Sequence, residues 1–153
     1  MQIEIAVSEL AVAKSKKKMK TRLQSGCIPY RIKDGITEVC LVKKLKKDAW
    51  WGFTKGGAEK HLDNRENAAK ECYEEAGVTG TVTKKIGKFE YVKDDMNQVV
   101  TMYAMQFHTE LTTWPEKKLR KRKWFTLNEA RDKLSREHHK LLDAIKKIAK
   151  KEK

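Results

Sequence analysis

The sequence contains few cysteines, no long apolar run and no recognisable leader. Cys27, Cys40 and Cys72 are far apart and form no CxxC pair, which argues against a disulfide framework or a zinc site. No apolar run approaches the roughly 20 residues that span a bilayer. The N-terminus carries Glu4 where a signal peptide would carry cations. We therefore expect a cytoplasmic protein with reduced thiols and no membrane segment.

Internal repeats and low-complexity linkers are also absent, and 153 residues suit one domain with a single core. We expect residues 21–153 to form that domain. Residues 1–20 would be an N-terminal extension. Alternating Ile3, Ile5 and Val7 followed by lysines leave both a short strand and a flexible arm open for this extension.

Positive charge is the most abundant feature, with a formal net charge of +14. Such an excess raises the local concentration of polyanions and speeds their encounter. Two clusters, at residues 14–22 and 146–153, are typical of solvated tails. The third, at residues 117–123, runs directly into Trp124 and Phe125, so we expect it to be anchored to packed structure.

The pattern of apolar residues predicts a mixed sheet with several helices. We expect strands at residues 23–32, 38–43, 50–54, 78–91, 98–109 and 124–125. Asp63 with Glu66, and Thr126 with Glu129, match the capping-box spacing and predict helix starts. The first helix would end at Gly77, the second at Leu134, and a last helix would begin at Ser135. The fold class is therefore α/β (α+β).

Three carboxylates share one face of the first predicted helix. Glu71, Glu74 and Glu75 stand at i, i+3 and i+4, and like charges at this spacing repel one another. A hard divalent cation would reverse that repulsion, since Mg²⁺ prefers oxygen ligands. On these residues alone, a solvated acidic face is the favoured interpretation, since acidic clusters are common.

The order of the surrounding residues resembles the Nudix box. Gly56 is followed at the family spacing by Lys70-Glu71-Cys72-Tyr73-Glu74-Glu75-Ala76-Gly77-Val78. The resemblance implies the Nudix fold, a mixed sheet sandwiched between helices. It also implies Mg²⁺, with Mn²⁺ as an alternative, bound by the Gly56 carbonyl and by Glu71, Glu74 and Glu75. Glu75 is the candidate general base, with Asp94, Asp95 and Glu137 as alternatives.

Two positions depart from the box: Leu62 stands where the family has its first Glu, and Lys70 stands where it has Arg. In the family these two residues often support the metal-binding acids, so their joint loss points to a linked change. We expect activity, with altered metal affinity or rate.

Further motifs are similar to the diphosphoinositol polyphosphate phosphohydrolase branch, notably the run from Arg120 to Phe125 and the late Lys140. The resemblance implies that Arg120 or Arg122, together with Lys140, binds substrate phosphates. Lys55, beside the glycines, is a further candidate. Basic residues of that branch are replaced here by Val99 and Val100, which weakens the case for an inositol substrate.

Three functions therefore remain open. The leading one is Mg²⁺-dependent cleavage of a diphosphate in a highly phosphorylated small molecule, of the diphosphoinositol polyphosphate or dinucleoside polyphosphate type. The others are an RNA 5′-pyrophosphohydrolase and a non-catalytic module that binds a polyanion or RNA. A base could stack on an aromatic residue, but nothing in the sequence selects among the candidates Trp50, Trp51, Phe53, Trp124 and Phe125. The oligomeric state is not predicted.

Overall fold

The computed structural model describes residues 19–153. Residues 1–18 of the expected extension therefore lie outside the described residues. The strands are β1 (Lys20–Lys33), β2 (Ile36–Lys44), β3 (Trp51–Gly52), β4 (Thr54–Gly57), β5 (Val78–Lys93), β6 (Met96–Glu110) and β7 (Arg120–Thr126). The helices are α2 (Asn64–Ala76), α3 (Leu127–Lys133) and α4 (His139–Glu152), with a 3₁₀ turn at Arg136–His138.

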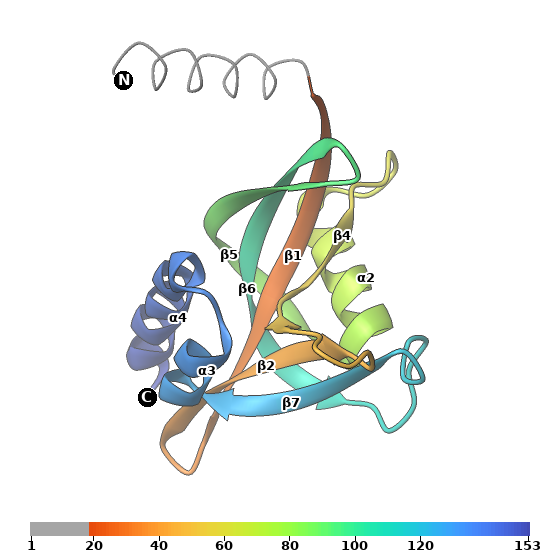
Figure 1. Cartoon of the computed structure of the whole chain (residues 1–153). Coiled ribbons are helices and arrows are strands. Elements are labelled where there is room, and N and C mark those ends of the chain that lie inside the picture. Colours follow the sequence, from red (N-terminus) through yellow and green to blue (C-terminus); the bar gives the residue numbers. More distant parts are fainter. Residues whose placement is uncertain (1–18) are drawn as a thin grey trace, which may run out of the picture.

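The strands form one mixed sheet in the order β3-β2-β1-β6-β5, with β4 added to β1 and β7 added to β2. Among the strands of residues 19–153, only β1 and β6 pair in parallel, from Lys20 opposite Met96 to Tyr30 opposite Gln106. Helix α2 covers one face of the sheet, and α3 and α4 cover the other (Figure 1). The expected mixed sheet between helices is confirmed.

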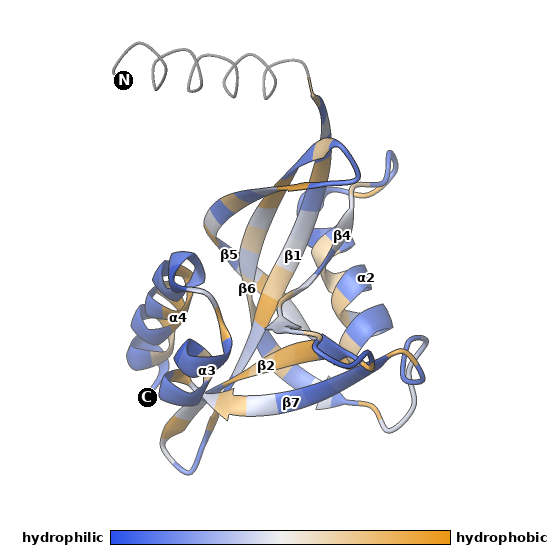
Figure 2. Ribbon diagram, viewed as in Figure 1, coloured by the Kyte–Doolittle hydropathy of each residue, from blue (hydrophilic) through white to orange (hydrophobic). Residues whose placement is uncertain are grey.

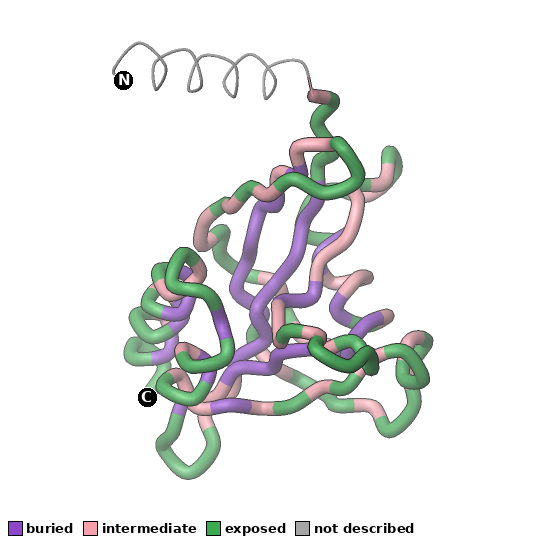
Figure 3. Tube along the Cα trace, in the orientation of Figure 1, coloured by how far each residue is buried: buried purple, intermediate pink, exposed green. Residues whose placement is uncertain are grey.

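Alternation along the strands divides the core into two layers. Ile28, Met102 and Leu41 face α3 and α4. Their neighbours Cys27 and Tyr103 face α2. Side chains of successive strand residues point to opposite faces, so each central strand is buried on both sides. Figure 3 shows this as continuous buried stretches along β1 and β6, and Figure 2 shows the hydrophilic outer surfaces of the helices.

Both predicted capping boxes are present. Asp63 accepts a hydrogen bond from the Glu66 backbone N–H, and Thr126 accepts one from the Glu129 backbone N–H. The last helical segment begins after Ser135 as expected, but its first turn, Arg136–His138, is 3₁₀ rather than α. The Ser135 side chain makes no capping hydrogen bond, and the 3₁₀ turn precedes α4, which begins at His139.

The strand expected at residues 124–125 is longer in the structure and includes part of the basic strip. Strand β7 begins at Arg120, because its backbone pairs with β2 from Lys44 opposite Arg120 to Glu38 opposite Thr126. Within β7 the side chains of Lys121 and Lys123 are exposed, whereas those of Arg120 and Arg122 are partly buried. Two of the six cations of the strip, Arg120 and Arg122, are thus anchored next to packed aromatic residues.

Candidate active site

Helix α2 positions the acidic face. Its capping box fixes the first turn, and Gly77 ends it in the left-handed conformation with φ 63°. A Cβ on Gly77 would lie 2.8 Å from the Trp114 ring, so glycine is required there for packing as well. The small buried residues Ala68, Cys72 and Ala76 allow α2 to lie close to the sheet. The side of the helix that carries Glu71 and Glu75 faces Gly56 and Lys55 of strand β4.

Glu71 lies directly against Gly56. A Cβ on Gly56 would come within 2.1 Å of the Glu71 carboxyl carbon and 2.3 Å of one carboxyl oxygen. The Gly56 carbonyl oxygen accepts a hydrogen bond from the Asn67 side-chain amide at 3.2 Å. Burial raises the pKa of Glu71, although the nearby Lys70 ammonium opposes the shift. This carboxylate and the glycines of β4 thus form one wall of a common site.

Glu75 is the most deeply placed acid of the helix, with 6% of its surface exposed. One carboxyl oxygen accepts a hydrogen bond from the Lys55 backbone N–H at 3.1 Å, and the other lies 3.4 Å from an Arg120 guanidinium nitrogen. Burial raises the pKa of Glu75 to about 7, and the Arg120 charge only partly offsets it. A buried carboxyl group with this pKa is favourably placed for a cation to stabilise its charged form.

Glu74 is oriented differently from the other two acids. Its carboxylate lies 3.0 Å from the Lys70 ammonium, which also contacts Glu59 at 2.9 Å and Glu71 at 3.6 Å. These partners raise the pKa of Lys70, Glu59 first among them. Among residues 19–153, no three His, Cys, Asp or Glu side chains lie close enough together to hold a metal ion. Glu74 is therefore turned to Lys70 rather than to a site shared by all three acids.

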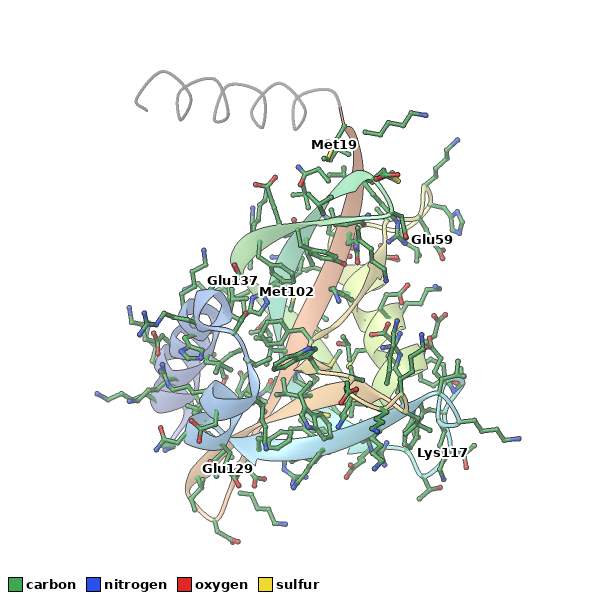
Figure 4. All side chains as sticks on the ribbon, viewed as in Figure 1. Met19, Glu59, Met102, Lys117, Glu129 and Glu137 are labelled. Atoms are coloured by element: carbon green, nitrogen blue, oxygen red, sulfur yellow. The ribbon has the colours of Figure 1, made fainter. Side chains whose placement is uncertain are left out.

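The departures from the Nudix box find a structural counterpart in this contact. Lys70 occupies the box Arg position, and its first partner is Glu59, three residues before Leu62. Figure 4 shows Glu59 in the loop between β4 and α2. The Nudix box did not indicate Glu59, because the box places its first Glu at the position of Leu62.

A cleft of about 570 Å³ lies in front of Gly56, Glu71 and Glu75. Its remaining walls carry five cations, from β1, β2, β4, β5 and β7: Arg22, Lys44, Lys55, Lys93 and Arg120. A buried and a partly buried acid surrounded by cations suit a diphosphate. A metal held by the acids would bind some of the negative oxygens of the diphosphate, and the cations would bind the others.

The cleft gathers some of the predicted binding residues and not others. Lys55 and Arg120 line it. Arg122 does not, since its guanidinium donates to the Ala76 carbonyl at 2.9 Å and pairs with Glu110 at 3.0 Å. Lys140 is an exposed residue of α4, on the other face of the sheet.

Of the alternative bases, only Asp94 lines this cleft. Asp95 is its neighbour in the β5–β6 turn, and Glu137 lies beside α4, as Figure 4 shows. The sequence reasoning missed Arg22, Lys44 and Lys93. Period-two alternation places Arg22 on the same face of β1 as Gln24 and Gly26, which is the signal that would have indicated Arg22.

The fold agrees with that of known proteins. The NUDIX domain family model matches residues 20–145, and the chain therefore belongs to the NUDIX family. It is 38% identical to Nudix hydrolase 4 of Arabidopsis thaliana over 117 residues, covering 70% of this chain and 56% of that protein. It is 39% identical to the mitochondrial Nudix hydrolase 18 of the same plant, covering 70% and 65%. The chain thus spans less than two thirds of these relatives.

Two further comparisons bear on the branch and the fold. The diphosphoinositol polyphosphate phosphohydrolase 2 of Rattus norvegicus is 30% identical over 109 residues, covering 70% of this chain and 59% of that protein. The binary complex of a C. elegans Ap4A hydrolase superposes with a TM-score of 0.71 at 20% identity, covering 84% of this chain and 97% of that one. At this identity the second likeness supports the fold alone.

Proposed function

We propose that this protein is a Mg²⁺-dependent hydrolase that cleaves a diphosphate linkage in a highly phosphorylated small molecule, with Mn²⁺ as an alternative metal. The observation that carries the proposal is the pairing of the buried carboxylate of Glu75 and the partly buried carboxylate of Glu71 with Gly56 in a cleft otherwise rich in cations. Members of the NUDIX family generally use divalent metal ions.

The residues present fit such a metal. Glu71, Glu75 and the Gly56 carbonyl offer hard oxygen atoms, the type that Mg²⁺ prefers. No side chain larger than hydrogen fits at Gly56 without displacing the Glu71 carboxylate. Glu74 remains a proposed ligand, and it would have to exchange its contact with Lys70 for the metal. When bound, the metal would neutralise charge on the diphosphate and lower the pKa of an attacking water.

The chain itself supplies positioning and proton transfer. The backbone N–H of Lys55 and the guanidinium of Arg120 fix both oxygens of Glu75, so its orientation in the cleft is defined. Glu75 is our proposed general base, and Asp94 is the second candidate because it lines the same cleft. Lys55 and Arg120 would bind phosphate oxygens. Catalysis would then rest mainly on orientation and electrostatics.

Five cleft cations favour a substrate with several phosphates over one with a single diphosphate. Diphosphoinositol polyphosphates and dinucleoside polyphosphates both meet this condition. Among residues 19–153, no helix is long and apolar enough to cross a membrane. The cytoplasmic location stays a prediction, since several similar Arabidopsis proteins carry mitochondrial or chloroplastic names.

The test is turnover of a substrate panel with and without Mg²⁺. The panel contains diphosphoinositol pentakisphosphate, diadenosine tetraphosphate, ADP-ribose and RNA with a 5′ triphosphate. Glu71→Gln and Glu75→Gln should abolish metal-dependent turnover. Glu90→Gln, an exposed acid on β5, is the matched control and should retain it. Preferred turnover of the RNA would establish the RNA alternative. Binding of these ligands without turnover by the unaltered protein would refute the hydrolase and support a binding module.

A further inference from the structure

Trp50 differs from the other three tryptophans in having almost no packing partner, with 86% of its surface exposed. Trp51 packs edge-on against Phe125, and Trp124 packs against Phe107. The Trp114 indole N–H donates to the Glu75 carbonyl. An isolated exposed tryptophan contributes little to stability, because its large apolar surface is not removed from water. Trp50 is therefore the one aromatic candidate of the sequence that is free to contact a ligand.

Trp50 lies in a hollow that adjoins the cleft of Glu71 and Glu75. A hollow of about 330 Å³ has Trp50 in its wall, together with Phe53. Lys44, Lys55 and Arg120 line both this hollow and the catalytic cleft. The two spaces thus meet at three cations, and a ligand whose phosphates contact these cations could extend into the hollow.

The segment that carries Trp50 is anchored by its backbone. The Leu45 N–H donates to the Leu119 carbonyl at 3.1 Å, and the Ala49 N–H donates to the Lys46 carbonyl at 3.2 Å. Anchoring of the flanking residues lowers the entropy that ordering the segment around a ligand would cost.

The junction between the two spaces is strongly positive. Neighbouring cations lower the pKa of Lys44, first Lys93, then Arg120. Lys46 and Lys47 add two more positive charges to the wall that holds Trp50, and Asp48 adds one negative charge. An anionic ligand would relieve this mutual repulsion. An aromatic face beside clustered lysines is the combination that binds a base and its phosphates.

We propose that Trp50 stacks on a nucleobase of the substrate while Lys44, Lys46 and Lys47 bind the adjoining phosphates. The substrate class would then be a nucleoside polyphosphate, with the base in the Trp50 hollow and the scissile diphosphate in front of Glu71 and Glu75. This inference rests on the proposed function for the location of the diphosphate. A saturated inositol ring offers no aromatic face, so Trp50 would contribute little to its binding.

The test compares two probes that share phosphates and differ in the base. Binding of diadenosine tetraphosphate and of tripolyphosphate is measured by calorimetry on the full chain, for Trp50→Ala, Trp50→Phe and the control Leu45→Ala. Leu45 is an exposed apolar residue of the same segment that does not line the hollow. We expect Trp50→Ala to weaken diadenosine tetraphosphate binding about tenfold or more, the range of one stacked base, and to leave tripolyphosphate binding unchanged.

Trp50→Phe should recover most of the lost affinity, and Leu45→Ala should match the unaltered protein for both probes. Equal losses for both probes, or no loss for either, would overturn the stacking site. Because these are binding measurements, they give an answer even if the protein hydrolyses nothing. Absence of turnover would refute the proposed function, and absence of a base-dependent loss would refute the Trp50 site. With turnover established, Trp50→Ala should raise KM for diadenosine tetraphosphate and leave kcat within about twofold, since the stacked base is remote from the reacting atoms.

Discussion

At Gly56 the backbone itself approaches the catalytic helix, and this contact gives the sharpest prediction at the scale of single residues. Gly56→Ala would force a methyl group against the Glu71 carboxyl group. We expect activity to fall about 100-fold, the loss that a displacement of about 1 Å can cause. The overpacking should also destabilise the fold by about 1–3 kcal/mol. Steady-state kinetics and thermal melting measure the two effects separately.

A second substitution identifies the cause of that destabilisation. Glu71→Ala removes the carboxyl group that the new methyl would meet. In the double variant the melting temperature should therefore be higher than in Gly56→Ala alone, while activity stays lost. A double variant as unstable as Gly56→Ala would mean that the methyl group collides with something other than Glu71.

The contact between Glu59 and Lys70 leads to a prediction about metal affinity. In Glu59→Gln, Lys70 keeps only Glu74 and Glu71 as partners, so it should compete more strongly with a cation for both acids. The Mg²⁺ concentration for half-maximal activity should rise about two- to fivefold, the range expected for an exposed ion pair. Lys60→Gln, an exposed neighbour, is the control. An unchanged or lower Mg²⁺ requirement in Glu59→Gln would show that the pair plays no part in the metal site.

At the scale of elements, the capping box of α2 connects pH to the stability of the acidic helix. Hydrogen bonds from Glu66 lower the pKa of Asp63 below its usual value of 3.8. A lowered pKa stabilises the fold above pH 3.8, and this contribution is lost as the pH falls through the lowered value. Asp63→Ala should therefore lower the melting temperature by about 2–4 °C at pH 7. The difference between the two proteins should shrink at pH 3. A constant difference across this range would contradict the cap.

The elements that could be predicted from the sequence are those determined by interactions between residues close in the chain. The helix starts at Asp63 and Thr126 were predictable, because a capping box involves residues three apart. The 3₁₀ geometry of the turn after Ser135 was not predictable, since no side-chain cap of Ser135 determines it. The distinction between Arg120 and Arg122 was also out of reach. Both lie on β7, and their partners depend on where α2 packs. In the structure Arg120 pairs with Glu75, and Arg122 donates to the Ala76 carbonyl.

At the scale of the whole molecule, the domain boundary can be tested by shortening the chain. Strand β1 begins at Lys20 and pairs with β6 from that residue onwards. We propose that the residues that precede this pairing are a dispensable extension. A chain beginning at Met19 should melt within a few degrees of the full chain and retain its kcat. A large loss of stability would place part of residues 1–18 in the domain.

The net charge of +14 could act as a whole or through the cleft alone, and two matched variants separate these cases. One replaces Arg22, Lys44 and Lys93, which line the cleft, by Gln. The other replaces Lys147, Lys150 and Lys151, which lie on α4, on the other face of the sheet. Each removes three positive charges. If the molecule attracts substrate by its total field, both should raise KM for a polyanionic substrate to a similar degree.

We expect the cleft variant to raise KM much more than the α4 variant, because exposed charges beyond about 10 Å are largely screened at 0.1 M salt. Its KM should also depend less on salt than that of the unaltered protein, since the charges that salt screens have been removed. Measurements of KM at several ionic strengths test both points. Equal effects of the two variants at low salt would assign recognition to the overall charge of the protein, and the cleft cations would then have no special role in binding phosphate.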